Sequence, residues 1–109
     1  MIKIGDTVKV TVDRPMGSRH PEHSGLVYEV NYGYIEGTKA EDGEEIDAYV
    51  LGVYEPIDKF CGRVIAIIRR LNDIEDKLVV APFRKRFRKS DIIELTEFQE
   101  KYFKVEIEM

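Results

Sequence analysis

The sequence has little cysteine and no long apolar run. Its single cysteine, Cys61, forms no internal disulfide, so a disulfide framework and every multi-cysteine zinc site are excluded. No segment approaches the roughly 20 consecutive apolar residues of a membrane span. The first residues also lack the apolar region of a signal peptide. We therefore expect a cytoplasmic protein without a membrane partner.

An excess of positive charge is also missing. The 109 residues carry a formal net charge of −4, which argues against a nucleic-acid partner bound by overall charge. The length suffices for one core but not for a TIM barrel or a two-domain dinucleotide-binding enzyme. We therefore expect a single domain over residues 1–109. The charges are uneven, because residues 41–47 are acidic and residues 84–89 hold five bases in six.

Alternation of apolar and polar residues is the main pattern along the chain. It predicts half-buried strands at residues 7–13, 26–34, 46–50 and 104–109. Nearly unbroken apolar runs at 62–68 and 78–80 predict two more strands, the first buried on both faces. Gly33 interrupts its strand, as expected at a bulge or a close backbone approach. Short strands at this length predict a mainly β fold, a small five-stranded OB-like closed barrel.

One helix is expected near the end of the chain. Thr96 and Gln99 fit a capping box, and Phe98 and Tyr102 lie four residues apart on one helical face. These residues predict a short C-terminal helix over about Thr96–Phe103.

The acidic segment at residues 41–47 is the sharpest candidate for chemistry. Asp42, Glu44 and Asp47 converge if Gly43 forms a turn, and close carboxylates repel one another unless a cation lies between them. Ligands that offer only oxygen suit Mg²⁺ or Mn²⁺. From the residues alone, a solvated acidic turn before a strand is the simpler interpretation.

Two neighbouring motifs resemble the soluble (family I) inorganic pyrophosphatases. Residues 31–38 read N-Y-G-Y-I-E-G-T, and residues 42–47 read D-G-E-E-I-D, which is similar to the family signature D-x-D-x-x-D. The resemblance covers about Tyr28–Leu51 and continues more weakly through Gly62–Pro82. It implies hydrolysis of pyrophosphate to orthophosphate by a metal-activated water, with Mg²⁺ or Mn²⁺ as cofactor. It also implies a homo-oligomer.

The resemblance implies a role for each matching residue. Glu44 matches the acid that activates the attacking water, although the family has Asp there. The implied metal ligands are Asp42, Asp47, Asp73 and Glu75, with Asn72 as an alternative to Asp73. The implied substrate-binding residues are Tyr32, Lys77, Tyr102, Lys104 and Arg14. Asp13 and Tyr28 are further members of the site.

The chain departs from the family in the segment that follows Pro15. The Lys and Arg that the family places early in the chain have no clear counterpart here, and Arg14 and Arg19 are candidate substitutes. His20 and His23 lie in this segment and are interpreted as surface residues. Cys61 is interpreted as a buried small hydrophobic residue.

Two other functions stay open. One is a non-catalytic OB-like module that binds nucleic acid or another anionic ligand through Arg84–Lys89, a variant of which is a family member that has lost activity. The other is a homologue that hydrolyses a different small phosphoanhydride. Carboxylates at Glu44 and Glu75 favour a metal site, whereas the missing early bases favour altered chemistry.

Overall fold

The computed structural model describes residues 2–40 and 43–109. The elements in this part of the chain are, in order, β1 (Thr7–Arg14), β2 (Asn31–Ile35), β3 (Ile46–Val50), β4 (Lys59–Arg70), β5 (Lys77–Ala81), α1 (Lys89–Glu100) and β6 (Val105–Glu108). No helix in these residues is both long enough and apolar enough to cross a membrane.

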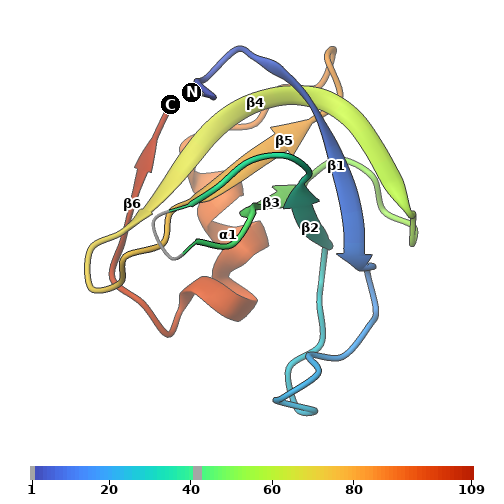
Figure 1. Ribbon diagram of the computed structural model, residues 1–109, viewed down its shortest axis with the longest axis vertical. Helices are drawn as coiled ribbons and strands as arrows, with labels where there is room; N and C mark the ends of the chain where they lie inside the picture. Colours follow the sequence, from blue (N-terminus) through green and yellow to red (C-terminus); the bar gives the residue numbers. More distant parts are fainter. Residues whose placement is uncertain (1, 41–42) are drawn as a thin grey trace.

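Five of the strands close into a barrel (Figure 1). Their order is β1-β2-β3-β5-β4, and β4 pairs again with β1 to complete the ring. Only the β3–β5 pair is parallel among these described strands. The 12 residues of β4 are long enough for its first part to pair with β1 and its last part with β6. This topology confirms the mainly β fold with a five-stranded OB-like closed barrel.

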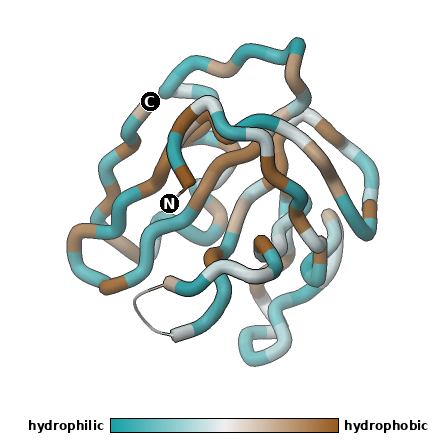
Figure 2. Tube along the Cα trace, turned by 45° about the horizontal axis from the view of Figure 1, so that its top comes forward, coloured by the Kyte–Doolittle hydropathy of each residue, from teal (hydrophilic) through white to brown (hydrophobic). Residues whose placement is uncertain are grey.

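Two apolar clusters lie on opposite faces of the barrel wall. All five barrel strands contribute to the inner cluster, which includes Val10, Ala48, Val50 and Val80. The outer cluster lies between the wall and α1 and includes Tyr28, Tyr49, Ile68, Val79, Ile92 and Phe98. Adjacent residues such as Tyr49 and Val50 fall into different clusters because successive strand residues face opposite sides. Figure 2 shows hydrophobic and hydrophilic residues interspersed along the chain trace.

The helix begins at Lys89 and not at Thr96, so the predicted capping box is wrong. Thr96 is buried inside the helix, where its hydroxyl donates a hydrogen bond to the Ile92 carbonyl at 2.8 Å. The N-cap is Arg88, whose backbone N–H donates to the Asp91 carboxylate at 2.8 Å. The side chain of Gln99 turns toward barrel tyrosines instead. Thr96 is thus an interior residue of the helix, and Gln99 makes tertiary contacts with Tyr28 and Tyr49.

Four smaller predictions have different outcomes. Strand β2 begins at Asn31 and not at residue 26, although Tyr28 is already buried. The prediction of a strand at 62–68 buried on both faces is wrong, because β4 is fully buried on one face and half-buried on the other. The prediction that Cys61 is buried is also wrong, because its side chain is exposed. The close approach at Gly33 is confirmed, because a Cβ atom there would collide with the Thr11 carbonyl of the paired strand.

Candidate active site

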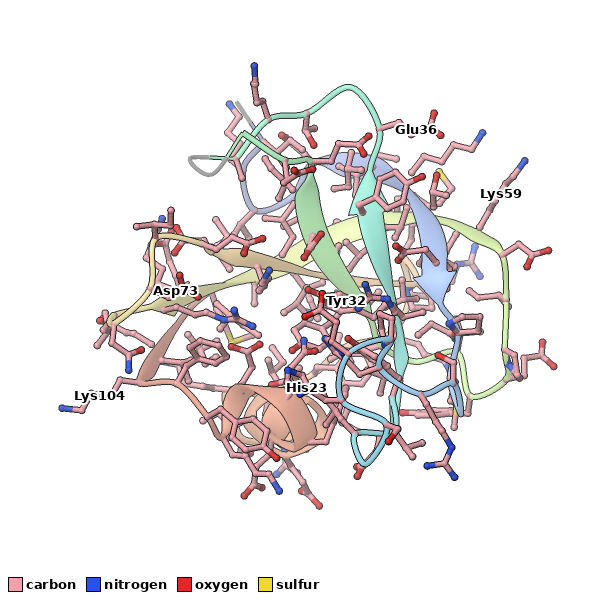
Figure 3. All side chains as sticks on the ribbon, turned by 60° about the horizontal axis from the view of Figure 1, so that its bottom comes forward. His23, Tyr32, Glu36, Lys59, Asp73 and Lys104 are labelled. Carbon is pink, nitrogen blue, oxygen red and sulfur yellow. The ribbon has the colours of Figure 1, made fainter. Side chains whose placement is uncertain are left out.

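A cleft of about 1110 Å³ lies beside α1, on the outer face of the barrel wall. Strand alternation places its residues, because Asp47, Lys77 and Arg70 share the face of Tyr49, Val79 and Ile68. Helix α1 contributes Gln99, and the segment after it contributes Tyr102 and Phe103. In Figure 3 the Tyr32 ring lies near the centre of this region, with His23 between the helix and the loop before β2.

Four residues form the Lys77 cluster, namely Lys77, Asp47, Glu75 and Tyr32. The Lys77 ammonium lies 2.8 Å from Asp47 Oδ2 and 2.7 Å from Glu75 Oε1, and the Lys77 side chain is only 3% exposed. The Tyr32 hydroxyl donates to the same Asp47 oxygen at 2.7 Å. The two carboxylates, one on β3 and one from the loop between β4 and β5, thus converge on a single cation.

Burial keeps Tyr32 protonated. Loss of solvent raises the pKa of its hydroxyl well above the ordinary value of 10.0, and the negative charge of Asp47 raises this pKa further. Tyr32 is therefore a hydrogen-bond donor to Asp47 throughout the neutral range.

Arg70 forms the other charged wall of the cleft. Its Nε and Nη2 groups donate to the two Glu100 oxygens at 2.9 and 2.7 Å, and its Nη1 donates to Asp73 Oδ2 at 3.3 Å. The guanidinium also stacks on the Phe103 ring, 3.8 Å from its centroid. Burial alone would lower the pKa of Arg70, but the hydrogen bonds and charge of Glu100 raise it above its ordinary value.

Asp73 is an anionic partner of this wall. Its carboxylate accepts a hydrogen bond from the Ile74 backbone N–H at 2.7 Å, and this bond together with Arg70 lowers the pKa of Asp73.

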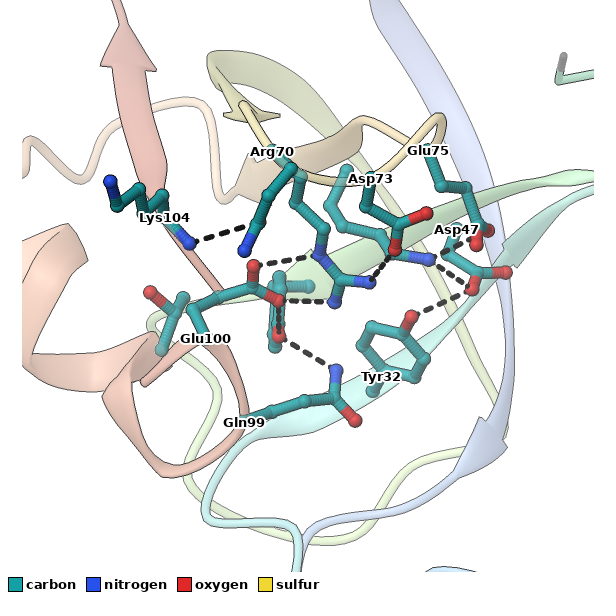
Figure 4. A network of polar contacts seen from close by, with 12 residues as sticks. Tyr32, Asp47, Arg70, Asp73, Glu75, Gln99, Glu100 and Lys104 are labelled. Carbon is teal, nitrogen blue, oxygen red and sulfur yellow. Dashed lines mark hydrogen bonds and ion pairs between the residues drawn. The ribbon is translucent and has the colours of Figure 1, made fainter. Parts of the chain in front are cut away.

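A chain of hydrogen bonds, buried from Tyr28 onward, joins Arg14 to Arg70, and we call it the tyrosine relay. Arg14 donates to the Tyr28 hydroxyl at 2.9 Å, and Tyr28 donates to Gln99 Oε1 at 2.8 Å. Gln99 Nε2 donates to the Tyr49 hydroxyl at 2.7 Å, and Tyr49 donates to Glu100. Figure 4 shows the part of the relay from Gln99 to Arg70. The helix thereby ties two cations on β1 and β4 into one network.

Most of the residues expected from the sequence line this cleft. They are Asp13, Arg14, Tyr28, Tyr32, Glu44, Asp47, Glu75, Lys77 and Tyr102. Asp73 accepts a hydrogen bond from Arg70 but is outside the set of residues that line the cleft. Lys104 is exposed and its side chain points away from the cleft (Figure 3), while its backbone N–H donates to Asn72. Asp42 lies outside the described residues.

The sequence reasoning missed several cleft residues. Arg70, Gln99 and Phe103 line the cleft, and so do the two histidines. The interpretation of the histidines as surface residues holds, since His23 is exposed and His20 is half-buried at the rim of the cleft. Burial and the nearby Arg14 lower the pKa of His20. One signal for Arg70 existed, because it continues the buried phase of Val64, Ala66 and Ile68 along β4. A charged residue in that phase needs a buried partner.

The chemistry of the cleft fits a hard divalent cation. Among residues 2–40 and 43–109, no three His, Cys, Asp or Glu side chains are close enough to form a metal centre by themselves. Asp47 and Glu75 nevertheless already share one cation, the ammonium of Lys77. The acids lining the cleft are Asp13, Glu22, Glu44, Asp47 and Glu75, against Arg14, Arg70 and Lys77 as its Arg and Lys residues. An anion entering this acidic cleft requires added positive charge, and carboxylates are the ligands that Mg²⁺ prefers.

Comparison with known proteins gives one consistent result. A sequence model described as inorganic pyrophosphatase matches residues 2–108. An inorganic pyrophosphatase of Campylobacter jejuni is 31% identical over 94 residues, which is 77% of this chain and 53% of that protein. This chain therefore spans about half the length of that relative.

Solved structures share the fold at lower sequence identity. An inorganic pyrophosphatase from Ehrlichia chaffeensis has a TM-score of 0.70 at 19% identity, covering 96% of this chain and 88% of that one. One from Neisseria gonorrhoeae has a TM-score of 0.69 at 21% identity, covering 90% of this chain and 74% of that one. The fold similarity thus extends over nearly all of this chain.

Proposed function

The chain belongs to the inorganic pyrophosphatase family, and from this premise we propose that it hydrolyses pyrophosphate to orthophosphate with the help of divalent cations. One observation carries the proposal. Carboxylates and bases from β1, β3, β4 and β5 and from the loops between strands converge in one cleft, with Asp47 and Glu75 already gathered on a cation.

Mg²⁺ is the proposed cofactor, with Mn²⁺ as an alternative. Asp47 and Glu75 would hold it, and Asp42 and Asp73 are the further ligands proposed from the sequence. Bound divalent cations would neutralise phosphate charge and lower the pKa of a nearby water molecule. Support comes from the excess of acids over bases in the cleft, since pyrophosphate would otherwise meet net repulsion.

The side chains of the cleft then have distinct tasks. Glu44 is the proposed general base that accepts a proton from the attacking water. Lys77, Arg14 and Tyr102 would hold phosphate oxygens, and Tyr32 keeps Asp47 in place through its hydrogen bond. Tyr28 orients Arg14, and Asp13 lies beside Arg14 in the cleft. Lys104 is not part of this proposed binding set because its side chain points away.

The test is release of orthophosphate from pyrophosphate by the purified chain with Mg²⁺, compared with release from ATP and tripolyphosphate. We expect pyrophosphate to be the preferred substrate. Preference for another compound would favour the alternative of a different small phosphoanhydride. Absence of hydrolysis with all three would overturn the enzymatic proposal and favour a binding module.

Location and assembly complete the proposal. The chain has a single cysteine, which is free and exposed, so its fold forms without an internal disulfide bond. This supports a reducing compartment, and we propose the cytoplasm. We also propose a homo-oligomer, which light scattering of the purified chain would detect as a mass above 12.7 kDa.

A further inference from the structure

Arg70 offers hydrogen-bond donors that the described residues do not use. A guanidinium has five N–H groups. Three of them donate, two to Glu100 and one to Asp73. The remaining two, one on each terminal nitrogen, have no acceptor among residues 2–40 and 43–109. Neighbouring N–H groups of this kind match the spacing of two phosphate oxygens.

The guanidinium is held in place before any ligand arrives. Its side chain is 6% exposed, Glu100 fixes its inner edge, and Phe103 stacks on its face. Most of its rotamer freedom is therefore already lost on folding. Binding through such a group costs less side-chain entropy than binding through a mobile surface arginine.

The position of Arg70 relative to the Lys77 cluster suits a two-phosphate ligand. In Figure 4 the guanidinium lies between Glu100 of the helix and Asp73, with Asp47 and Glu75 on the far side of Asp73. Arg70 and Lys77 thus present two cations to the same cleft from adjacent strands, β4 and β5. Glu100 balances the Arg70 charge while the cleft is empty, so no unpaired charge is buried.

We propose that Arg70 is a substrate-binding residue that contacts one phosphate group of pyrophosphate from the β4 wall. In this role it supplies the charge that the expected early Lys and Arg do not supply in this chain. The proposal rests on the function proposed above. It names a residue that the motif resemblance did not select, and it assigns Glu100 and Phe103 the task of positioning it.

The experiment measures binding rather than turnover. Methylenediphosphonate, a non-hydrolysable analogue of pyrophosphate, is titrated into the protein with Mg²⁺ in a calorimeter. Mg²⁺ alone is titrated separately. The main variant combines Arg70→Gln with Glu100→Gln, which removes the buried pair without leaving one charge unpaired. Arg70→Lys is the second variant, because it keeps the charge but loses the planar fork.

The control is Arg69→Gln at the neighbouring position. Arg69 faces the opposite side of β4, where it is paired with Asp76 and Glu108 on the exposed surface. It does not line the cleft.

We expect the dissociation constant of the analogue to rise about 10- to 100-fold in the double variant, the range for losing charge-assisted hydrogen bonds. The dissociation constant of Arg70→Lys for the analogue should lie between those of the double variant and the parent. If the double variant does not fold, Arg70→Lys is the variant that tests the proposal. Mg²⁺ alone should bind no more weakly in any variant than in the parent, and Arg69→Gln should match the parent in both titrations.

Analogue affinity equal to that of the parent, in the folded double variant or in Arg70→Lys, would overturn the proposal. The two proposals fail in different ways. A parent that binds the analogue through Arg70 but does not hydrolyse pyrophosphate supports this inference and overturns the proposed activity. If the parent hydrolyses pyrophosphate and the Arg70 variants bind the analogue as tightly as the parent does, only this inference is overturned.

Discussion

Glu44 is the residue at which the acidic segment departs from the family signature. It lines the cleft, and its carboxylate extends one methylene further than the Asp of the signature. A positioned base is sensitive to a displacement of that size. The proposed base, Glu44, would therefore hold its carboxylate farther from the backbone than the Asp of the signature does.

Glu44→Gln should lower the rate of pyrophosphate hydrolysis about 10²–10⁴-fold, because the amide keeps the shape but accepts no proton. Mg²⁺ affinity, measured by calorimetry, should fall little, and Glu44→Asp should raise the rate above that of the parent. Glu45→Gln is the matched control, since Glu45 neighbours Glu44 but does not line the cleft. Hydrolysis by Glu44→Gln at the parental rate would show that Glu44 is not the base.

Tyr32 should remain protonated in alkaline solution. Burial and the Asp47 charge hold its pKa well above 10.0, so deprotonation is unfavourable in the folded state. Absorbance of tyrosinate during an alkaline titration should therefore be the same for the parent and Tyr32→Phe through pH 10 while both remain folded. A step near pH 10 that disappears in Tyr32→Phe would contradict the buried, donating hydroxyl.

Helix α1 acts in this fold as the element that joins opposite walls of the cleft. Successive residues divide the task, since Gln99 contacts the tyrosines and Glu100 contacts Arg70. Arg14 and Arg70, at the two ends of the relay, can only donate hydrogen bonds. This restriction fixes which group donates and which accepts in each bond between them. In the middle of the relay, the Gln99 amide accepts from Tyr28 through its oxygen and donates to Tyr49 through its nitrogen.

Gln99→Glu should destabilise the protein, because Tyr49 loses the N–H that donates to it and two buried carboxylates become neighbours. The expected loss is about 1–3 kcal/mol of unfolding free energy, the cost of an unsatisfied buried polar group. Urea denaturation at pH 7 measures it, with Glu97→Gln on the exposed side of the same helix as control. Equal midpoints for Gln99→Glu and the parent would show that the relay does not stabilise the fold.

Strands were more predictable from the sequence than the helix. The alternation of apolar and polar residues predicted the bounds of β1 and β3 closely. A half-buried strand repeats every two residues, so a few residues are enough to reveal it. The start of the helix was misplaced because Thr96 and Gln99 have the residue types and spacing of a cap. In the structure, the Thr96 hydroxyl bonds to the Ile92 carbonyl of the same helix, and Gln99 bonds to Tyr49 of the barrel. Local propensity is a weak prior where a side chain is buried.

At the scale of the whole molecule, the cleft depends on contacts that a linear motif does not reveal. The acidic segment, Lys77 and Tyr32 were selected together because they belong to motifs that resemble those of one family. Arg70 and Glu100 were missed because 30 positions separate them and their pairing exists only after β4 and α1 meet. Barrel closure through β1 and β4 likewise joins distant segments, which composition and period do not specify.

The central claim is that this cleft hydrolyses pyrophosphate with divalent cations held by its carboxylates. The most direct test follows orthophosphate release from pyrophosphate while Mg²⁺ is raised from zero, for the parent and for Asp47→Asn. We predict no release without a divalent cation, saturable release by the parent, and a large loss of Mg²⁺ dependence and rate in Asp47→Asn. Equal release by the parent with and without Mg²⁺, or by the two proteins at every Mg²⁺ concentration, would contradict the claim.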